Sequence, residues 1–171
     1  MIYKYKAFGV AVAIILAVYF VLSQYGFKTS VKQDAVLERI KLPAGFKIDV
    51  FASDLGGSPV SSPGPNPGPR MLLLKDDVLL VTIPSQGKVV ALPNSNGDKK
   101  ADKVITFISN LNNPHGIDFY DGWFYIAEEN SVIRIKDSDN DLRADIDTLE
   151  RLTDLPEGGH FTRTVKIHNN S

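Results

Sequence analysis

The sequence predicts an all-β fold of repeated four-stranded units, a β-propeller, and three observations support this fold class. Residues 89–102 and 132–145 align without gaps at an offset of 43 residues, and five of the fourteen pairs are identical. An offset of this size lies in the range of roughly 40–50 residues that is typical of propeller blades. Short apolar and β-branched runs also alternate with turn-forming residues on either side of both copies.

The first 27 residues predict a membrane-spanning or secretory helix. Lys4 and Lys6 precede an uncharged run, residues 7–22, and extension to Phe27 gives 21 residues, close to the roughly 20 that span a bilayer. A cleavable signal peptide has the same layout, but residues 23–26 match its small-x-small exit poorly, which favours an uncleaved anchor. Basic residues before the run place the rest of the chain outside the cytoplasm. We expect a protein anchored in the membrane and facing the periplasm or extracellular side, or else exported.

Residues 28–41 are polar and charged, and we interpret them as a tether. Residues 42–171 are then expected to form the propeller portion. Alternation of Phe46, Ile48 and Val50 with charged residues predicts a half-buried strand. Residues 56–69 hold five prolines and four glycines, which predicts an exposed loop. A linker between domains is the alternative, but only one predicted strand precedes this stretch.

The remaining strands fall into two units and part of a third. The first unit is predicted at 71–74, 79–83, 88–92 and 104–108, and the second at 116–120, 123–127, 131–135 and 146–149. Asp121-Gly122 is a strong hairpin signal between two of them. A third unit begins at 162–168. The chain would therefore supply about two and a half blades of a propeller that typically has four to eight, and we expect it to be a truncated N-terminal portion.

Composition excludes several classes of site and partner. The chain has 19 basic and 20 acidic residues and a net charge of −1, so no basic surface for nucleic acid is predicted. The absence of cysteine excludes disulfides and cysteine-based zinc or catalytic sites.

Seven motifs in order suggest a family. They lie at residues 42–48, 69–71, 87–92, 112–117, 123–129, 132–134 and 158–164. Together they resemble the pyrroloquinoline quinone (PQQ)-dependent soluble glucose and sorbosone dehydrogenases, which act on aldose sugars. The resemblance covers the chain from about Leu42 to its end.

The resemblance implies a six-bladed propeller that holds PQQ over its central channel, with calcium against the cofactor. It also implies a sugar substrate and a histidine that takes the proton of the C1 hydroxyl as hydride passes to the quinone. His160 matches that histidine, and an imidazole can act as a base near neutral pH. Some relatives carry an acidic residue directly before the histidine, where this chain has Gly159. Most PQQ and calcium ligands would lie beyond Ser171, so the fragment alone is expected to be inactive.

Two other residues are candidates for the substrate or cofactor pocket. His115 stands at the equivalent entry of the preceding unit, and stabilisation of a turn is its alternative role. Arg163 lies three residues after His160, so a strand would turn it to the opposite side, and we interpret it first as a structural partner.

The two aligned loops offer a weak metal site. Asp137, Asp139 and Asp141 occupy positions 1, 3 and 5 of a calcium-loop pattern, and Asp145 occupies position 9. Leu142 replaces the glycine of position 6, and Thr148 replaces the glutamate of position 12. Turns capped by their own Asp and Asn side chains are the alternative.

Three functions are compatible with these features. The first is an anchored or exported PQQ-dependent sugar dehydrogenase, an oxidoreductase of which this chain is the N-terminal part. The second is a non-catalytic propeller binding module of a cell-surface protein. The third is a propeller lactonase or hydrolase, which would need a metal-binding cluster at the channel.

Overall fold

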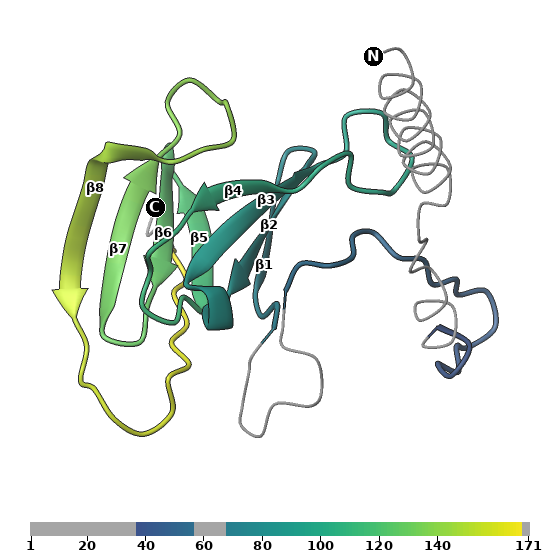
Figure 1. Cartoon of the computed structure of the whole chain (residues 1–171), viewed down its shortest axis with the longest axis horizontal. Helices are drawn as coiled ribbons and strands as arrows, with labels where there is room; N and C mark the ends of the chain where they lie inside the picture. The colour runs from purple at the N-terminus through teal and green to yellow at the C-terminus, as the bar shows by residue number, and fades with distance from the viewer. Residues whose placement is uncertain (1–36, 57–67, 169–171) are drawn as a thin grey trace, which may run out of the picture. The chain divides into compact units, whose positions relative to one another are not determined.

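A computed structural model of the chain describes residues 37–56 and 68–168 (Figure 1). The helix expected over residues 1–27 lies outside these ranges. Within them, no helix has the length and apolar character needed to cross a membrane. The chain divides into two compact units, Met1–Asp49 and Val50–Ser171, and every strand of the described residues belongs to the second unit.

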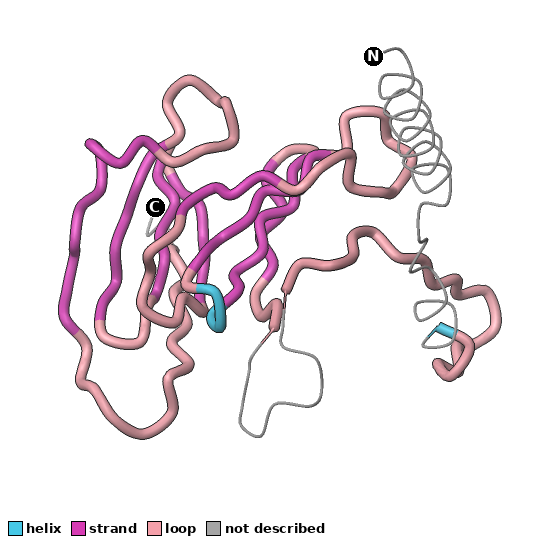
Figure 2. The backbone as a smooth tube through the Cα atoms, in the orientation of Figure 1, coloured by secondary structure: helices cyan, strands magenta, loops and turns pink. Residues whose placement is uncertain are grey.

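The second unit contains two four-stranded antiparallel sheets that repeat one strand order. The first sheet has the order β1 (Leu72–Lys75), β2 (Val78–Ile83), β3 (Lys88–Pro93), β4 (Ile105–Ile108). The second has the order β5 (Gly116–Tyr120), β6 (Trp123–Ala127), β7 (Ser131–Lys136), β8 (Asp145–Asp154). Figure 2 shows each sheet as a run of strands joined by loops. The all-β prediction and the eight strands of the two complete units are confirmed, although β8 is ten residues long, where only residues 146–149 were predicted. The number of blades stays a prediction.

Tight turns connect neighbouring strands at sites that the sequence marks. Asp121 and Gly122 between β5 and β6 have φ of 49° and 77°, as the type I′ hairpin turn requires. Between β2 and β3 a short 3-10 helix, η1 (Pro84–Gln86), ends at Gly87 with φ of 55°. A Cβ at Gly87 would lie 2.6 Å from the carbonyl oxygen of Leu111, so this position requires glycine.

The main core lies between the two sheets. The first sheet contributes Leu80, Val89, Ala91 and Phe107, and the second contributes Ile117, Phe124, Ile126, Ile133 and Ile135. The rings of Phe107 and Phe124 meet edge-on across the core, with centroids 4.7 Å apart. The alternation of apolar residues along each strand therefore serves to bury one face of each sheet against the other.

The outward face of the first sheet is also apolar. Val81, Ile83, Val90 and Leu92 are at most 2% exposed. They pack against residues 51–55, and the N–H of Ala101 donates to the carbonyl of Phe51 over 2.8 Å. Residues 51–55, before the proline-rich stretch, thus cover this face. This packing explains why these residues are held against the first sheet without pairing as a strand.

The outward face of the second sheet is polar and aromatic. The guanidinium of Arg134 lies 4.1 Å from the centroid of the Trp123 ring, and the Lys136 ammonium lies 4.4 Å from it. Arg134 also pairs with Glu150 at 2.6 Å across β7 and β8. Glu150 holds the pKa of Arg134 above its ordinary value through this hydrogen bond.

Two strand predictions are wrong. Residues 46–50 form no strand, and Phe46 is 70% exposed after a turn in which its N–H donates to the carbonyl of Pro43. Alternation alone predicted a strand there, but within the described residues no neighbouring strand pairs with it.

Residues 162–168 also form no strand, although their burial alternates as it would in one. This segment runs beside β5, where a Cβ on Gly116 would come within 2.7 Å of the Val165 nitrogen. The N–H of Ile167 donates to the side chain of Asp118 over 2.7 Å instead of to a backbone carbonyl. The side-chain acceptor replaces the ladder that the sequence predicted.

Candidate functional site

The chain passes from one sheet to the next at a single edge of the fold. Arg70 precedes β1, His115 follows it by 45 residues and precedes β5, and His160 follows His115 by another 45 residues. β1 and β5 are in contact, and the Thr82 hydroxyl donates to the carbonyl of His115 over 2.9 Å. Arg70, His115 and His160 therefore stand at equivalent positions, before β1, β5 and the segment beside β5. We call the side of the fold that carries these three residues the linker edge.

His115 is held at the linker edge by its ring and its backbone. Its N–H donates to the carbonyl of Ala127, and its Nδ1 lies 3.0 Å from the carbonyl oxygen of Arg163. Because a carbonyl only accepts hydrogen bonds, Nδ1 carries the proton and Nε2 of a neutral ring keeps its lone pair. The ring also meets Phe161 edge-on, with centroids 6.4 Å apart. His115 therefore has a fixed orientation and, in this tautomer, one ring nitrogen that can accept a hydrogen bond.

Arg163 organises the loop that carries His160. Its guanidinium donates to the carbonyls of Pro156 at 2.9 Å and Thr162 at 3.2 Å, and also to the carbonyl of His160. The His160 side chain itself is exposed. The structure thus brings the predicted residues His115, His160 and Arg163 to one edge, because the Arg163 carbonyl meets the His115 ring and the Arg163 guanidinium donates to the His160 carbonyl. Their catalytic or pocket roles stay predictions.

Glu128 is a buried carboxylate of the linker edge that sequence reasoning missed. It is 7% exposed, and its two oxygens accept from the N–H of Asn112 at 2.7 Å and the hydroxyl of Ser131 at 2.6 Å. The next residue, Glu129, accepts from the amide of Asn113 at 2.7 Å. These bonds tie the linker between the sheets to the β6–β7 turn. The signal in the sequence was the pair of acidic residues, Glu128 and Glu129, directly after an apolar strand.

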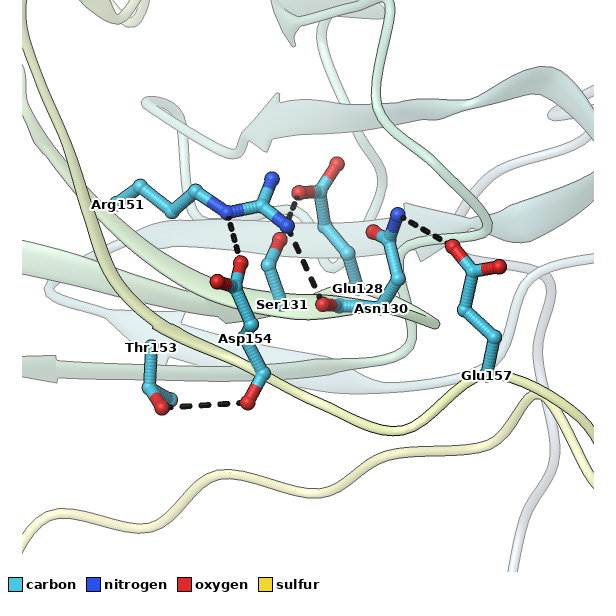
Figure 3. Close-up of polar contacts among 7 residues, drawn as sticks. All are labelled: Glu128, Asn130, Ser131, Arg151, Thr153, Asp154 and Glu157. Carbon is cyan, nitrogen blue, oxygen red and sulfur yellow. Dashed lines mark hydrogen bonds and ion pairs between the residues drawn. The ribbon is translucent and has the colours of Figure 1, made fainter.

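The end of β8 closes the linker edge with further polar contacts (Figure 3). Arg151 pairs with Asp154 at 2.6 Å and donates to the carbonyl of Asn130 at 3.3 Å. The amide of Asn130 in turn donates to Glu157 at 3.2 Å. These contacts therefore fix the start of the loop that leads to His160.

Asp118 on β5 fixes the segment that follows His160. Its carboxylate is 4% exposed and accepts from the Ile167 N–H at 2.7 Å and from the Lys166 ammonium at 3.0 Å. Burial opposes ionisation of Asp118, but hydrogen bonds from Ile167, Lys166 and Phe119 and the charge of Lys166 together outweigh it and hold its pKa below the ordinary value. The sequence placed Asp118 on a strand and gave it no role.

The structure brings together three of the four predicted metal-binding aspartates. Carboxylate oxygens of Asp137, Asp139 and Asp141 lie within 4.8 Å of one another. Burial raises the pKa of Asp137, and repulsion from Asp141 and Asp139 adds to that rise. Asp145 instead accepts from the N–H of Ser138 at 2.8 Å, and the hydrogen bonds from Ser138 lower its pKa. Metal binding by this loop stays a prediction.

The first repeat shows the role of the hydrogen bond between Ser138 and Asp145. There the N–H of Ser95 donates to Asp102 over 2.7 Å, as Ser138 does to Asp145 one repeat later. A capped turn therefore explains the shared Ser and Asp of both loops without a metal.

Comparison with protein families identifies the described region. A family profile described as "Domain of unknown function (DUF7133)" matches residues 32–152. The chain belongs to the DUF7133 family. The matched region includes both sheets as far as Leu152, together with His115, Asp118 and Glu128, whereas His160 and Arg163 follow it.

Two solved structures resemble this DUF7133 chain in part. They are the iodide and calcium structures of Trichoderma reesei carbohydrate-active enzymes family AA12, each at 24% identity over 58% of the chain, with TM-scores of 0.49 and 0.48. The chain spans 27% and 26% of their lengths, about a quarter of each. A search of curated proteins gave no match.

Proposed function

We propose that this DUF7133 chain contributes two blades, and part of the substrate-side edge, to a quinone-dependent sugar dehydrogenase with a propeller fold. The ordered set of motifs from Leu42 to Thr164 carries the proposal. The contact between β1 and β5, with residues 163–165 beside Gly116, supports a radial arrangement of successive units.

On this proposal His160 is the base that takes the hydroxyl proton of the sugar. Its side chain is exposed, and Arg163 holds its carbonyl and that of Pro156, which fixes the loop around it. The lone pair of His115 Nε2 would face the same edge as a second contact for a hydroxyl group. Both assignments use side chains that water can reach, as a sugar substrate requires.

PQQ and calcium are the cofactors that the resemblance implies, and the described residues do not fit them by themselves. PQQ is a planar tricarboxylate, so its site needs several free cations. The Arg163 guanidinium already donates to backbone carbonyls. The other guanidinium near Phe161 is that of Arg70, which lies 6.0 Å from the centroid of the Phe161 ring. The buried carboxylate of Glu128 is occupied by Asn112 and Ser131 and is not a ready calcium ligand.

Dye-linked oxidation of an aldose tests the proposal. The protein is expressed from its complete reading frame and supplied with PQQ and calcium. Loss of the general base in His160→Ala is expected to lower kcat by about 10²- to 10⁴-fold. His168→Ala is the matched control, because His168 is an exposed histidine in the same segment. PQQ retention, measured by absorbance, separates loss of the base from loss of the cofactor site. Full activity in His160→Ala would eliminate it as the base.

The satisfied hydrogen bonds of Glu128 and Arg163 favour a second candidate, a non-catalytic binding module. A module of this kind would bind an aldose without oxidising it and without a requirement for PQQ. Calorimetric titration with the same sugars distinguishes the two functions.

A further inference from the structure

A cavity of about 160 Å³ opens between the two sheets at the edge opposite the linker edge. The cavity lies beside the β1–β2 turn and the loop that follows β7. Strand β7 runs from the linker edge to this opposite edge. The inner wall is formed by Leu80, Ala91, Phe107 and Phe124, each at most 3% exposed. Its wall is therefore apolar, while its mouth reaches solvent through two loops.

Leu142 forms part of the wall at the cost of backbone strain. It has φ of 68°, which is unusual for a bulky side chain, and it packs against the core between the sheets. The equivalent residue of the first repeat, Lys99, has nearly the same φ of 67° but is exposed. The second repeat thus keeps the backbone of the loop and turns an apolar side chain toward the cavity.

The charge at the mouth of the cavity is negative. Lys75 and Asp76 pair at 2.8 Å and neutralise each other. Asp137 also lines the cavity, and the carboxylates of Asp139 and Asp141 lie within 4.8 Å of it and of each other. No other cation lines this cavity in the part of the chain that the structure describes. An occupant with a positive charge beside Asp137 would complement this mouth.

We propose that this cavity binds a small organic ammonium ion whose aromatic or branched-alkyl body enters the apolar wall. A cavity of about 150 Å³ with Leu, Ile and Phe walls is large enough for benzene. An ammonium group at the mouth would form a charge-assisted hydrogen bond with the half-buried carboxylate of Asp137. An apolar body with one placed charge is the usual chemistry of a small-molecule site.

Calorimetric titration of the full 171-residue chain with benzylammonium tests this proposal. Residues 1–27 are predicted to be a membrane anchor, so the chain is held in lipid nanodiscs, because detergent tails compete for apolar cavities. Benzyl alcohol serves as the neutral isostere and benzoate as the anion of similar size. We expect benzylammonium to bind at least about tenfold more tightly than benzyl alcohol, a difference of about 1.4 kcal/mol, and benzoate not to bind.

Two variants locate the site. Asp137→Asn keeps one of the two oxygens, which accept separately from the N–H groups of Asp141 and Leu142, and it should remove the tenfold preference while leaving the affinity for benzyl alcohol unchanged. Asp139→Asn is the matched control, since it removes the same charge from the same loop without lining the cavity, and it should change the affinity less than threefold. Ala91→Leu should abolish binding of both ligands, with folding checked by circular dichroism.

Three outcomes would overturn the proposal. These are no binding of benzylammonium, equal affinity for benzylammonium and benzyl alcohol, and equal effects of Asp137→Asn and Asp139→Asn. Calcium titration adds a fourth arm. Calcium binding without benzylammonium binding would identify the aspartate loop as an ion site and eliminate the cavity as an ammonium site.

Discussion

The outward faces of the two sheets differ although the sheets share one strand order. In the first sheet this face consists of Val81, Ile83, Val90 and Leu92, and residues 51–55 cover it. In the second sheet it carries Trp123 between Arg134 and Lys136. The first face is buried by another part of the chain, whereas the second satisfies its charges with its own side chains.

The sequence repeat determines the backbone of both sheets but not the side chains on their outward faces. The repeated pattern fixes the strands, their order and the face that enters the common core. The outward side chains decide what each sheet can pack against, because an apolar face needs a cover and a cationic, aromatic face can meet water. Two copies of one backbone unit thus have different neighbours.

Leu92→Ala is expected to have the largest effect. Leu92 is 1% exposed, so its truncation leaves a cavity under residues 51–55 and should lower the free energy of unfolding by about 2–5 kcal/mol. The control is Val132→Ala on the half-buried outward face of the second sheet, which should cost less than about 1.5 kcal/mol. Urea unfolding measures both, and equal losses would contradict the proposed difference between the faces.

Phe51→Ala removes part of the cover and leaves the sheet itself intact. Phe51 is only half-buried, so the expected loss is roughly 2 kcal/mol, about half that of a fully buried phenylalanine. Hydrogen exchange should accelerate in β2 and β3 and not in β6 and β7. Phe46→Ala is the control, because Phe46 is 70% exposed and should change stability by less than about 0.5 kcal/mol. Uniform acceleration in both sheets would count against a local cover.

Asp118→Asn is expected to cost about 1–2 kcal/mol at neutral pH, because charged hydrogen bonds to Ile167 and Lys166 are weakened. Lys166→Met should cost less than about 0.5 kcal/mol, since the Lys166 side chain is 79% exposed. A larger effect of Lys166→Met would show that the ion pair and not the Ile167 N–H fixes the segment. Thermal unfolding of the three proteins provides the measurement.

Acid should remove the contribution of Asp118. Its pKa is lowered on folding from an ordinary value of 3.8, so its ionised form stabilises the fold fully above that pH. The contribution declines as the pH falls below 3.8 toward the folded-state pKa, and it is lost below that pKa. The stability difference between wild type and Asp118→Asn should therefore shrink on acidification below this range. A difference that is constant with pH would contradict the ionised state of Asp118.

Lys136→Gln should have the smallest effect, about 0.5–1 kcal/mol, from loss of its contact with the Trp123 ring. Trp123 is the single tryptophan of the chain, so its fluorescence reports on this face alone. The emission should shift in Lys136→Gln and stay unchanged in Lys88→Gln on the first sheet. Unchanged emission in both variants would place the ammonium away from the ring.

Local patterns predicted the two sheets because alternation and turn chemistry act over a few residues. Asp121-Gly122 set the register of one hairpin, and the repeat located the equivalent strands of both units. The same alternation failed at Phe46 and again beyond Thr162, where the outcome depends on which partner supplies the hydrogen bonds. That partner is distant in sequence, so a local pattern cannot specify it.

The linker edge was predicted less completely than the sheets. Spacing placed His115 and His160 at equivalent positions and turned Arg163 to the opposite side. The buried roles of Glu128 and Asp118 depend on partners 16 and 49 residues away, Asn112 and Ile167. A carboxylate on a predicted strand, as Asp118 is, or directly after one, as Glu128 is, is normally assigned to solvent. Only the three-dimensional contacts identify these two as internal hydrogen-bond acceptors.

Gly116 has a consequence for how this family tolerates change. Any side chain there would enter the backbone at Arg163, Thr164 and Val165, at distances of 2.7–2.9 Å from its Cβ. In a saturation mutagenesis library selected for the folded chain, we expect codon 116 to admit glycine and little else, not even alanine. Core positions such as Ile126 should admit several aliphatic residues. The smallest side chain of the inner strand would then be its most restricted site.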